Sequence, residues 1–305
     1  MTYLITGGTG FIGSHLARRL LQEGEEVLLY DYLPDFGKIH DIENRIRVVQ
    51  GDVLDSGSLE DVIKKYKVDQ LIHLASVLMP ESEVNPLKAV KINCEGTCRV
   101  FEAAKKTDVQ RVVWTSSISV YGASKYGGKP VDENTSFQPT TVYGHCKALN
   151  EFLGQYYFDQ HGLDVMGVRF TVVYGLGRTG GITAVTSKAI EAAVRGESVK
   201  IPYGDEEFNW LYVKDAVKAI TQACQVEDPR YRLFIIGGFT HTFREVAEIL
   251  KKLLPEAEIE VDPGKLEAYH TSHFNLSRAK KELGYEPSYT IEKGIKDQIE
   301  MMKSA

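Results

Sequence analysis

Short apolar segments rich in β-branched residues alternate with longer amphipathic segments over the first 170 residues. The apolar segments are the strands that we expect, at residues 2–6, 26–31, 47–50, 70–73, 111–115 and 164–168. Between them, residues 11–23, 58–66 and 89–105 carry apolar positions every three or four residues, as on one face of a helix. This alternation is typical of βαβ units, so the sequence predicts an α/β fold with a doubly wound parallel sheet.

The alternation becomes irregular after residue 170. A glycine-rich turn at residues 175–177 precedes a predicted helix over 182–195, an aromatic stretch over 208–212, a helix over 243–253 and a last helix after Thr290. No linker rich in Pro and Ser separates these segments from the first part of the chain. We therefore expect residues 171–305 to form mainly a smaller lobe packed on the sheet, with some segments returning to it. Such a lobe would cover the carboxyl ends of the strands, where open α/β sheets bind ligands.

Composition narrows the class of protein. The chain has 305 residues with 43% hydrophobic residues and a formal net charge of −6, which favours a folded protein and gives no basic patch for nucleic acid. No apolar run approaches the ~20 residues that span a bilayer, and the first apolar stretch runs directly into glycines. We expect a cytoplasmic protein without a membrane or nucleic-acid partner. Reduced structural thiols are expected at the four cysteines, which show no C-x-x-C spacing: Cys94, Cys98, Cys146 and Cys224.

A glycine-rich run connects the first predicted strand to the first predicted helix. Gly7, Gly10 and Gly13 stand in the run GGTGFIG at residues 7–13. Glycine allows a tight turn and a close approach of the backbone to a pyrophosphate, and the free N–H groups of the following helix favour an anion. In this context the run predicts a dinucleotide site in a Rossmann-type domain over residues 1–170. An ordinary glycine turn is the alternative.

Two carboxylates follow the next strands. Asp31 ends the second predicted strand, where a carboxylate can accept hydrogen bonds from both ribose hydroxyls of adenosine. Residues 32–34 offer no Arg or Lys for a 2′-phosphate, so the sequence predicts NAD rather than NADP. Asp52 follows the third strand and is expected to hold the adenine amino group. A solvated strand end is the alternative for Asp31, and a turn residue is the alternative for Asp52.

Candidate chemistry lies at Tyr143 and Lys147. They are four residues apart at the start of a helical stretch, which places an ammonium beside a phenol. A neighbouring cation and a positive nicotinamide ring favour the ionised phenol, and a fall of ~3 pKa units corresponds to ~4 kcal/mol. Ser116 and Ser117 follow the fifth predicted strand, so their hydroxyls are expected at the same edge of the sheet. A hydroxyl there can donate to a substrate oxygen as negative charge develops on it.

Taken together, these residues resemble the extended short-chain dehydrogenase/reductases, also called the NAD-dependent epimerase/dehydratase family. The resemblance covers nearly the whole chain. Its residues in chain order are Gly7, Gly10, Gly13, Asp31, Asp52, Val53, His73, Leu74, Ala75, Asn93, Gly96, Thr97, Ser117, Val120, Tyr121, Gly122, Tyr143, Lys147, Arg169, Tyr174, Gly175, Tyr212, Val213, Asp215, and the run from Asn275 to Gly284.

The resemblance implies a role for each site residue. Ser117 polarises the substrate oxygen, Tyr143 is the acid and base, and Lys147 tunes Tyr143 while binding the nicotinamide ribose. The remaining NAD-binding positions that we expect are Gly7, Gly10, Phe11, Ile12, Gly13, Asp31, Asp52, Val53, Leu74, Ala75, Asn93 and Ser116. The family commonly dimerises through helices that would here include residues 93–105 and 143–159, so a homodimer with a four-helix interface is expected.

The sequence departs from the family's nucleotide-sugar enzymes on the substrate side. Ser117 is followed by Ile and Ser rather than by the Asp-Glu pair of the dehydratases, so sugar dehydration is not expected. Val172 replaces an Asn that serves a nucleotide diphosphate in those enzymes, and Asn209-Trp210 replaces an Arg. An uncharged pocket balances two phosphates poorly, which favours a smaller substrate. Candidate substrate residues, for each of which core packing is the alternative, are Ser76, Leu78, Met79, Ser117, Thr171, Val172 and Trp210.

Histidines add little to this prediction. His145 lies two residues after Tyr143 and points to another side of the helix, so a structural role is expected. His270 and His273 lack an evident third ligand, and no metal site is predicted.

Three functions remain open at this stage. The first is an NAD-dependent dehydrogenase that interconverts a secondary alcohol, either a small hydroxy compound or a sugar derivative, and its ketone. The second is a nucleotide-sugar 4-epimerase that returns the hydride to the opposite face of the intermediate. A third, from another class, is a regulatory module that senses NAD(H) without catalysis.

Overall fold

The computed structural model describes residues 1–122, 129–266 and 271–304, and its centre is a parallel sheet. The seven strands lie in the order β10-β6-β5-β4-β1-β2-β3, and every adjacent pair is parallel. Their bounds are β1 (Thr2–Thr6), β2 (Glu26–Asp31), β3 (Arg47–Gln50), β4 (Gln70–His73), β5 (Arg111–Ser117), β6 (Val165–Phe170) and β10 (Leu233–Ile236). From β1 the chain adds β2 and β3 on one side and then β4, β5 and β6 on the other, so the strand order reverses between β1 and β4. Such a switch point is where these sheets bind ligands. The predicted α/β fold with a Rossmann-type sheet is confirmed.

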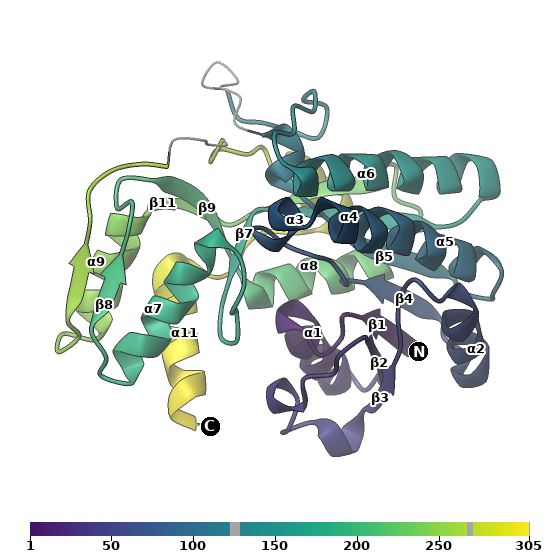
Figure 1. Ribbon diagram of the computed structural model, residues 1–305, viewed down its shortest axis with the longest axis horizontal. Helices are drawn as coiled ribbons and strands as arrows, with labels where there is room; N and C mark the ends of the chain where they lie inside the picture. Colours follow the sequence, from purple (N-terminus) through teal and green to yellow (C-terminus); the bar gives the residue numbers. More distant parts are fainter. Residues whose placement is uncertain (123–128, 267–270, 305) are drawn as a thin grey trace.

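Helices cover both faces of the sheet (Figure 1). On one face α1 (Phe11–Gln22) packs on α8 (Val213–Gln225), and α10 (Ser277–Leu283) lies beside β10. On the other face lie α2 (Ser56–Tyr66), α5 (Thr97–Lys105) and α6 (Val142–His161). Because both faces are covered, β4 and β6 are buried at every residue, which explains their continuous apolar character. Neither α8 nor β10 was among the expected elements.

Local signals explain where the helices begin. The Asp55 side chain accepts a hydrogen bond from Ser58 N at 3.0 Å, so α2 starts two residues before the prediction. Thr141 caps α6 in the same way, accepting from Gly144 N at 3.0 Å. The helix predicted over 89–105 is instead divided into α4 (Pro86–Ala89), a π-helical segment η3 (Val90–Gly96) and α5, preceded by the short helix α3 (Glu81–Val84). A π-helical turn of this kind is often found at functional sites.

Most of the remaining chain forms a lobe beside the carboxyl ends of the strands (Figure 1). Two small sheets lie in it, β7 (Val172–Tyr174), β9 (Glu207–Tyr212) and β11 (Phe239–Thr242) in one, and β8 (Val199–Ile201) and β12 (Ile259–Val261) in the other. Its helices are α7 (Val185–Val194), α9 (Phe243–Leu253) and α11 (Ile291–Ser304). A capping box between Thr242 and Glu245 starts α9 at the predicted residue. Short 3-10 turns complete the chain at η1 (Phe36–Lys38), η2 (Glu43–Arg45), η4 (Ile118–Tyr121) and η5 (Ile182–Ala184).

Candidate active site

The loop between β1 and α1 requires glycine at two positions. Gly7 has φ of +66°, and a Cβ atom there would lie 2.9 Å from the backbone N of Ala75. A Cβ atom at Gly13 would lie 2.5 Å from the carbonyl oxygen of Gly8. These contacts keep the loop tight and leave the first N–H groups of α1 directed at the space above it, which suits a pyrophosphate. Residues present in the loop therefore fit the dinucleotide that the sequence predicts.

Asp31 is held beside this loop by Thr9, a residue that the prediction did not include. Its Oδ2 accepts hydrogen bonds from Thr9 N at 3.1 Å and from Thr9 Oγ1 at 2.7 Å. Two cations of the neighbouring segments are occupied, since Arg18 pairs with Asp41 and Lys38 pairs with Asp35, each at 2.5 Å. The carboxylate at the end of β2 is thus oriented, and Arg18 and Lys38 already have carboxylate partners. Both features favour NAD.

Other predicted cofactor positions surround the same edge. Asp52 Oδ1 accepts from Leu54 N at 2.9 Å, the hydrogen bond of a turn residue, while Val53 packs against Gly96. Leu74 N donates to the carbonyl of Thr6 at 3.1 Å, and Ala75 lies against Gly7. Phe11 lies close to Gly175 at the end of β7. The adenine contact of Asp52 stays a prediction.

Asn93 fixes the loop that follows β4. Its Oδ1 accepts hydrogen bonds from Ser76 Oγ at 3.1 Å and Val77 N at 2.7 Å, and its Nδ2 donates to Val77 O at 2.9 Å. Asn150 Nδ2 in turn donates to the carbonyl of Asn93 at 2.7 Å. The π-helical turn places this carbonyl toward α6. Asn93 therefore supports the loop with the predicted substrate positions Ser76, Leu78 and Met79.

The three predicted catalytic residues lie together. Ser117 ends β5, and Tyr143 and Lys147 lie in the first two turns of α6. Lys147 Nζ lies 5.4 Å from the centre of the Tyr143 ring and donates to Thr115 O at 2.8 Å. Ser117 Oγ donates to Ser119 Oγ at 3.1 Å, and the Ser117 hydroxyl lies near the Tyr143 hydroxyl, whose pKa it lowers. The acidic side chain of Glu83 accepts from Val142 N and Tyr143 N at 3.1 and 3.2 Å, which fixes the start of α6.

Burial dominates the electrostatics of this cluster. Tyr143 is half-buried, and burial of its hydroxyl raises the pKa of Tyr143 to about 12. Burial also lowers the pKa of Lys147 to about 8. The predicted lowering of the Tyr143 pKa involves both Lys147 and the positive nicotinamide ring, and it stays a prediction for the protein with NAD+ bound. Ser117 and Arg178 oppose the rise in the Tyr143 pKa.

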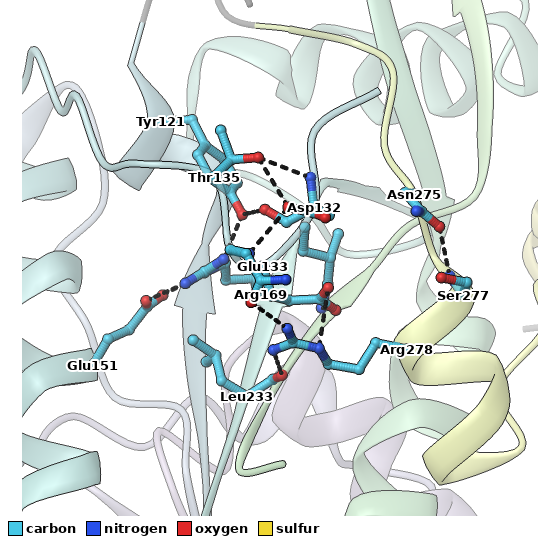
Figure 2. Close-up of polar contacts among 12 residues, drawn as sticks. Tyr121, Asp132, Glu133, Thr135, Glu151, Arg169, Leu233, Asn275, Ser277 and Arg278 are labelled. Carbon is cyan, nitrogen blue, oxygen red and sulfur yellow. Dashed lines mark hydrogen bonds and ion pairs between the residues drawn. The ribbon is translucent and has the colours of Figure 1, made fainter. Parts of the chain in front are cut away.

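A buried ion pair lies behind the cluster and was not predicted (Figure 2). Arg169 in β6 donates to Glu151 in α6 from Nε at 2.7 Å and from Nη2 at 2.5 Å. Glu151 also accepts from Ser116 Oγ at 2.5 Å, so this predicted cofactor hydroxyl is directed at the carboxylate. Arg169 Nη1 donates to the Tyr121 hydroxyl, which donates to Asp132 O at 2.6 Å.

This pair acts on the catalytic helix. Glu151 lies two helical turns after Tyr143 and one turn after Lys147, so the three residues share one face of α6. Its negative charge raises the pKa of Lys147 and partly offsets the effect of burial. The spacing of four residues could have revealed Glu151 in the sequence. Its partner Arg169 comes from another element and gives no local signal.

Predicted substrate positions differ in their exposure. Trp210 is fully buried among Tyr174, Phe208 and Phe243, and its Nε1 donates to His241 O at 2.9 Å, as a core residue does. Thr171 and Val172 are also buried, whereas Leu78 is 45% exposed. The packing of Trp210 therefore matches the alternative of a core residue rather than a substrate contact. A substrate role of the other positions stays a prediction.

Arg178 is a cation near the catalytic cluster that the sequence did not predict. It follows the glycine-rich turn after β7, and its charge interacts with the Tyr143 phenol. Burial lowers the pKa of Arg178 to about 10. Arg178 had no signal in the sequence, because a lone arginine in an irregular loop has no pattern that indicates where its side chain lies.

The cysteines and histidines considered in the sequence lie apart from the reacting groups or contact other protein groups. Cys94 and Cys146 line the same surface pocket, and all four cysteines are free thiols. His145 Nδ1 lies 2.9 Å from Thr141 O. Across residues 1–122, 129–266 and 271–304 no group of three or more potential ligands could hold a metal ion, and His270 lies outside the described residues. Within the same ranges no helix has both the length and the apolar character of a membrane span.

Comparisons with known proteins agree with this geometry. The NAD dependent epimerase/dehydratase family matches residues 3–237. A UDP-glucose 4-epimerase of Mycolicibacterium smegmatis is 29% identical over 100% of this chain and 99% of its own length. Among solved structures, UDP-glucose 4-epimerase of Thermotoga maritima is 27% identical with a TM-score of 0.89, covering 100% of this chain and 99% of that one. L-threonine dehydrogenase of Clostridium difficile is 29% identical with a TM-score of 0.89, covering 99% and 98%.

These findings confirm the predicted family, the predicted NAD cofactor and the predicted enzymatic nature of the protein. The resemblance covers both the cofactor edge and the segments that carry Ser117, Tyr143 and Lys147. The chain therefore belongs to the NAD-dependent epimerase/dehydratase family.

Proposed function

We propose that the protein is an NAD-dependent oxidoreductase that interconverts a secondary alcohol and its ketone. The observation that carries this proposal is the convergence of Ser117, Tyr143 and Lys147 at the carboxyl edge of β5, beside the glycine loop. Bound NAD+ supplies the hydride acceptor and a positive charge that favours the phenolate of Tyr143. In this proposal residues 1–170 supply the cofactor site, and the lobe of residues 171–305 supplies most of the substrate site.

Each catalytic side chain then has one task. The Ser117 hydroxyl donates a hydrogen bond to the substrate oxygen and orients the reacting carbon. The hydroxyl oxygen of Tyr143 takes the proton from the substrate hydroxyl as the hydride leaves the same carbon, and it returns the proton in the reverse direction. Lys147, held by Thr115 O, presents its charge to the Tyr143 ring and to the ribose side of the site. The buried cluster limits the access of water to the transferred proton.

A nucleotide-sugar 4-epimerase is the second candidate, supported by the relatives that carry that name. The two functions differ in the fate of the hydride. A dehydrogenase releases NADH, so absorbance at the NADH band rises with turnover. An epimerase returns the hydride, so it converts UDP-glucose to UDP-galactose without net NADH.

One screen separates these functions. The NAD+-loaded protein is incubated with alcohols, hydroxy acids and UDP-sugars, and both NADH absorbance and sugar products are followed. We expect NADH to accumulate with at least one small hydroxy compound. Epimerised UDP-sugar without NADH would reject the dehydrogenase in favour of the second candidate. No turnover with any compound would leave the non-catalytic NAD(H) sensor.

We further propose a homodimer, formed through α6 and the segments packed against it. Exposed apolar side chains gather there: Val84, Leu87, Val90, Leu149, Phe152 and Tyr156. Val90 and Leu149 line one surface pocket between η3 and α6, so the two helical segments form a continuous face. A second copy of this chain would cover these residues and build a four-helix interface. We also propose a cytoplasmic location, which suits four free thiols.

Phe152→Glu is expected to convert the dimer into a monomer. Phe152 is 65% exposed, so the substitution leaves the folded subunit intact but places a charge in the apolar interface. Sedimentation velocity at micromolar concentration measures the mass of the particle. Phe36→Glu, at a partly exposed aromatic position in η1, is the matched control and should stay dimeric. A wild-type monomer, or a dimeric Phe152→Glu protein, would reject this interface.

A further inference from the structure

Arg178 carries a buried donor for which no described residue provides an acceptor. Its Nη1 has no contact with solvent and no hydrogen-bond partner in the described part of the chain. The other two nitrogens are occupied, Nη2 by Thr183 Oγ1 at 2.7 Å and Nε by Gly180 O at 3.3 Å. Both of those acceptors are neutral, and the guanidinium forms no ion pair with any described residue. Such a buried cation is costly unless an anion pairs with it.

The surrounding backbone holds this guanidinium at the catalytic cluster. Gly175 N donates to Ser187 Oγ at 3.1 Å, and Gly177 N donates to Glu191 Oε1 at 3.2 Å, so the turn before Arg178 is anchored to α7. His15 Nε2 in α1 lies 2.9 Å from Leu176 O and fixes the other side of the turn. Hydrogen bonds of residues 175–177 therefore hold the turn in place, and with it the backbone position of Arg178.

Two observations locate the free side of the guanidinium. Its charge interacts with the Tyr143 phenol, which places it on the side of the reacting groups. A Cβ atom at Gly181 would lie 3.2 Å from Arg178 Nη2 and 4.0 Å from Met79 O, so the guanidinium also faces the loop after β4. The guanidinium therefore lies near the Met79 loop and interacts with Tyr143, and we infer that its free Nη1 faces the space between them, where the substrate is expected.

We propose that Arg178 binds a carboxylate of the substrate, next to the carbon that is oxidised. This inference rests on the proposed function and names the substrate class as a hydroxy acid or a uronic sugar. The charges near the reacting groups favour a negative charge on the substrate: Arg169 is paired with Glu151, Lys147 donates to the neutral carbonyl of Thr115, and Arg178 has one enclosed nitrogen for which no described residue provides an acceptor. A carboxylate accepts from the planar guanidinium in a fixed geometry, whereas a phosphate dianion would leave a second charge unbalanced.

Matched pairs of probes test this proposal by binding. The NAD+-loaded protein is titrated calorimetrically with L-threonine against L-threoninamide, and with UDP-glucuronic acid against UDP-glucose. We expect the carboxylate of at least one pair to bind about 10- to 100-fold more tightly than its neutral counterpart, the range for hydrogen bonds to charged groups. The first pair represents a small acid, and the second represents a uronic sugar.

Variants then assign the preference to Arg178. Arg178→Gln should abolish the preference for the carboxylate, and Arg178→Lys should keep part of it because the charge remains without the planar fork. Arg195→Gln, at an exposed arginine of the same lobe, should keep all of it. Affinity for NAD+ should be unchanged in every variant. Thermal unfolding should show Arg178→Gln to be no less stable than wild type, since a buried cation without an anion does not stabilise the fold.

The outcomes are distinct. Equal binding of the acid and neutral members in wild type, or a preference that survives Arg178→Gln, overturns the proposal. Loss of NAD+ affinity in Arg178→Gln would assign the guanidinium to the cofactor phosphates and also overturn it. The protein could also show a carboxylate preference that depends on Arg178 but no hydride transfer. That result would support this inference and reject the proposed function. Failure of the inference and failure of the proposed function therefore give different results.

Discussion

Tyr143→Phe is expected to reduce hydride transfer about 10²- to 10⁴-fold, the usual contribution of a positioned acid or base. The substitution removes only the hydroxyl that lies near Ser117. The aromatic ring stays, and with it the packing of Lys147 Nζ at 5.4 Å from the ring centre. Affinity for NAD+ should therefore remain within about twofold of wild type by the same reasoning. The measurement is the rate of NADH formation with the best alcohol of the screen.

A matched control is available on the same helix. Tyr156 lies in α6 but is 45% exposed and stacks on Phe152, away from the catalytic cluster. Tyr156→Phe should keep the wild-type rate, measured in the presence of saturating NAD+. If Tyr143→Phe also retained that rate, Tyr143 would have no role in proton transfer.

Arg169→Met is expected to lower the free energy of unfolding by about 3–5 kcal/mol, the cost of leaving one partner of a buried ion pair alone. Arg169 and Glu151 side chains are 1% and 4% exposed, so the Glu151 carboxylate would lose its cation without gaining water. Tyr121 would lose a donor as well. Urea unfolding followed by circular dichroism measures the change at neutral pH.

Two further variants show that charge is responsible for this loss. The double variant Arg169→Met with Glu151→Gln removes the unpaired charge and should recover part of the stability. Arg195→Met breaks the fully exposed pair of Arg195 with Glu197 and should have no measurable effect. A loss for Arg169→Met as small as for the exposed pair would show that the buried pair does not stabilise the fold.

The first six strands of the central sheet could be predicted from the sequence because they are short, β-branched and separated by regular helices. Predicted bounds for β1 to β4 agree with the structure, and β5 extends two residues further to include Ser116 and Ser117. After residue 170 no regular alternation of strands and helices marks the strands of the lobe, and β7, β8 and β12 have only three residues each. Runs that short do not distinguish a strand from a loop, so these strands were missed, as was the four-residue β11. The return of β10 to the sheet depends on tertiary packing rather than on local pattern.

The helix predicted over 89–105 shows a different limit. The apolar period continues through it, yet η3 adopts a π-helical turn whose wider backbone directs the carbonyl of Asn93 toward Asn150. Periodicity reports which face is buried but does not report the number of residues in each turn.

Residues of the site were predictable where a fixed spacing carries the chemistry. Gly7, Gly13, Tyr143 and Lys147 belong to such spacings. The pair of Arg169 with Glu151 joins two elements, and Arg178 depends on the path of an irregular turn, so neither had a local signal. The rise in the Tyr143 pKa that burial causes in the protein alone had no signal in the sequence, because the degree of burial is a property of the folded cluster.

The pH dependence of hydride transfer tests the central claim, that the Tyr143 phenol moves the proton, most directly. Burial raises the pKa of Tyr143 to about 12, so the phenolate needed for alcohol oxidation becomes more abundant as pH rises. In single turnovers with NAD+, the wild-type rate should increase by up to about tenfold per pH unit between about pH 7 and 9, and the residual rate of Tyr143→Phe should not depend on pH. A flat wild-type profile, or the same increase in Tyr143→Phe, would contradict the account.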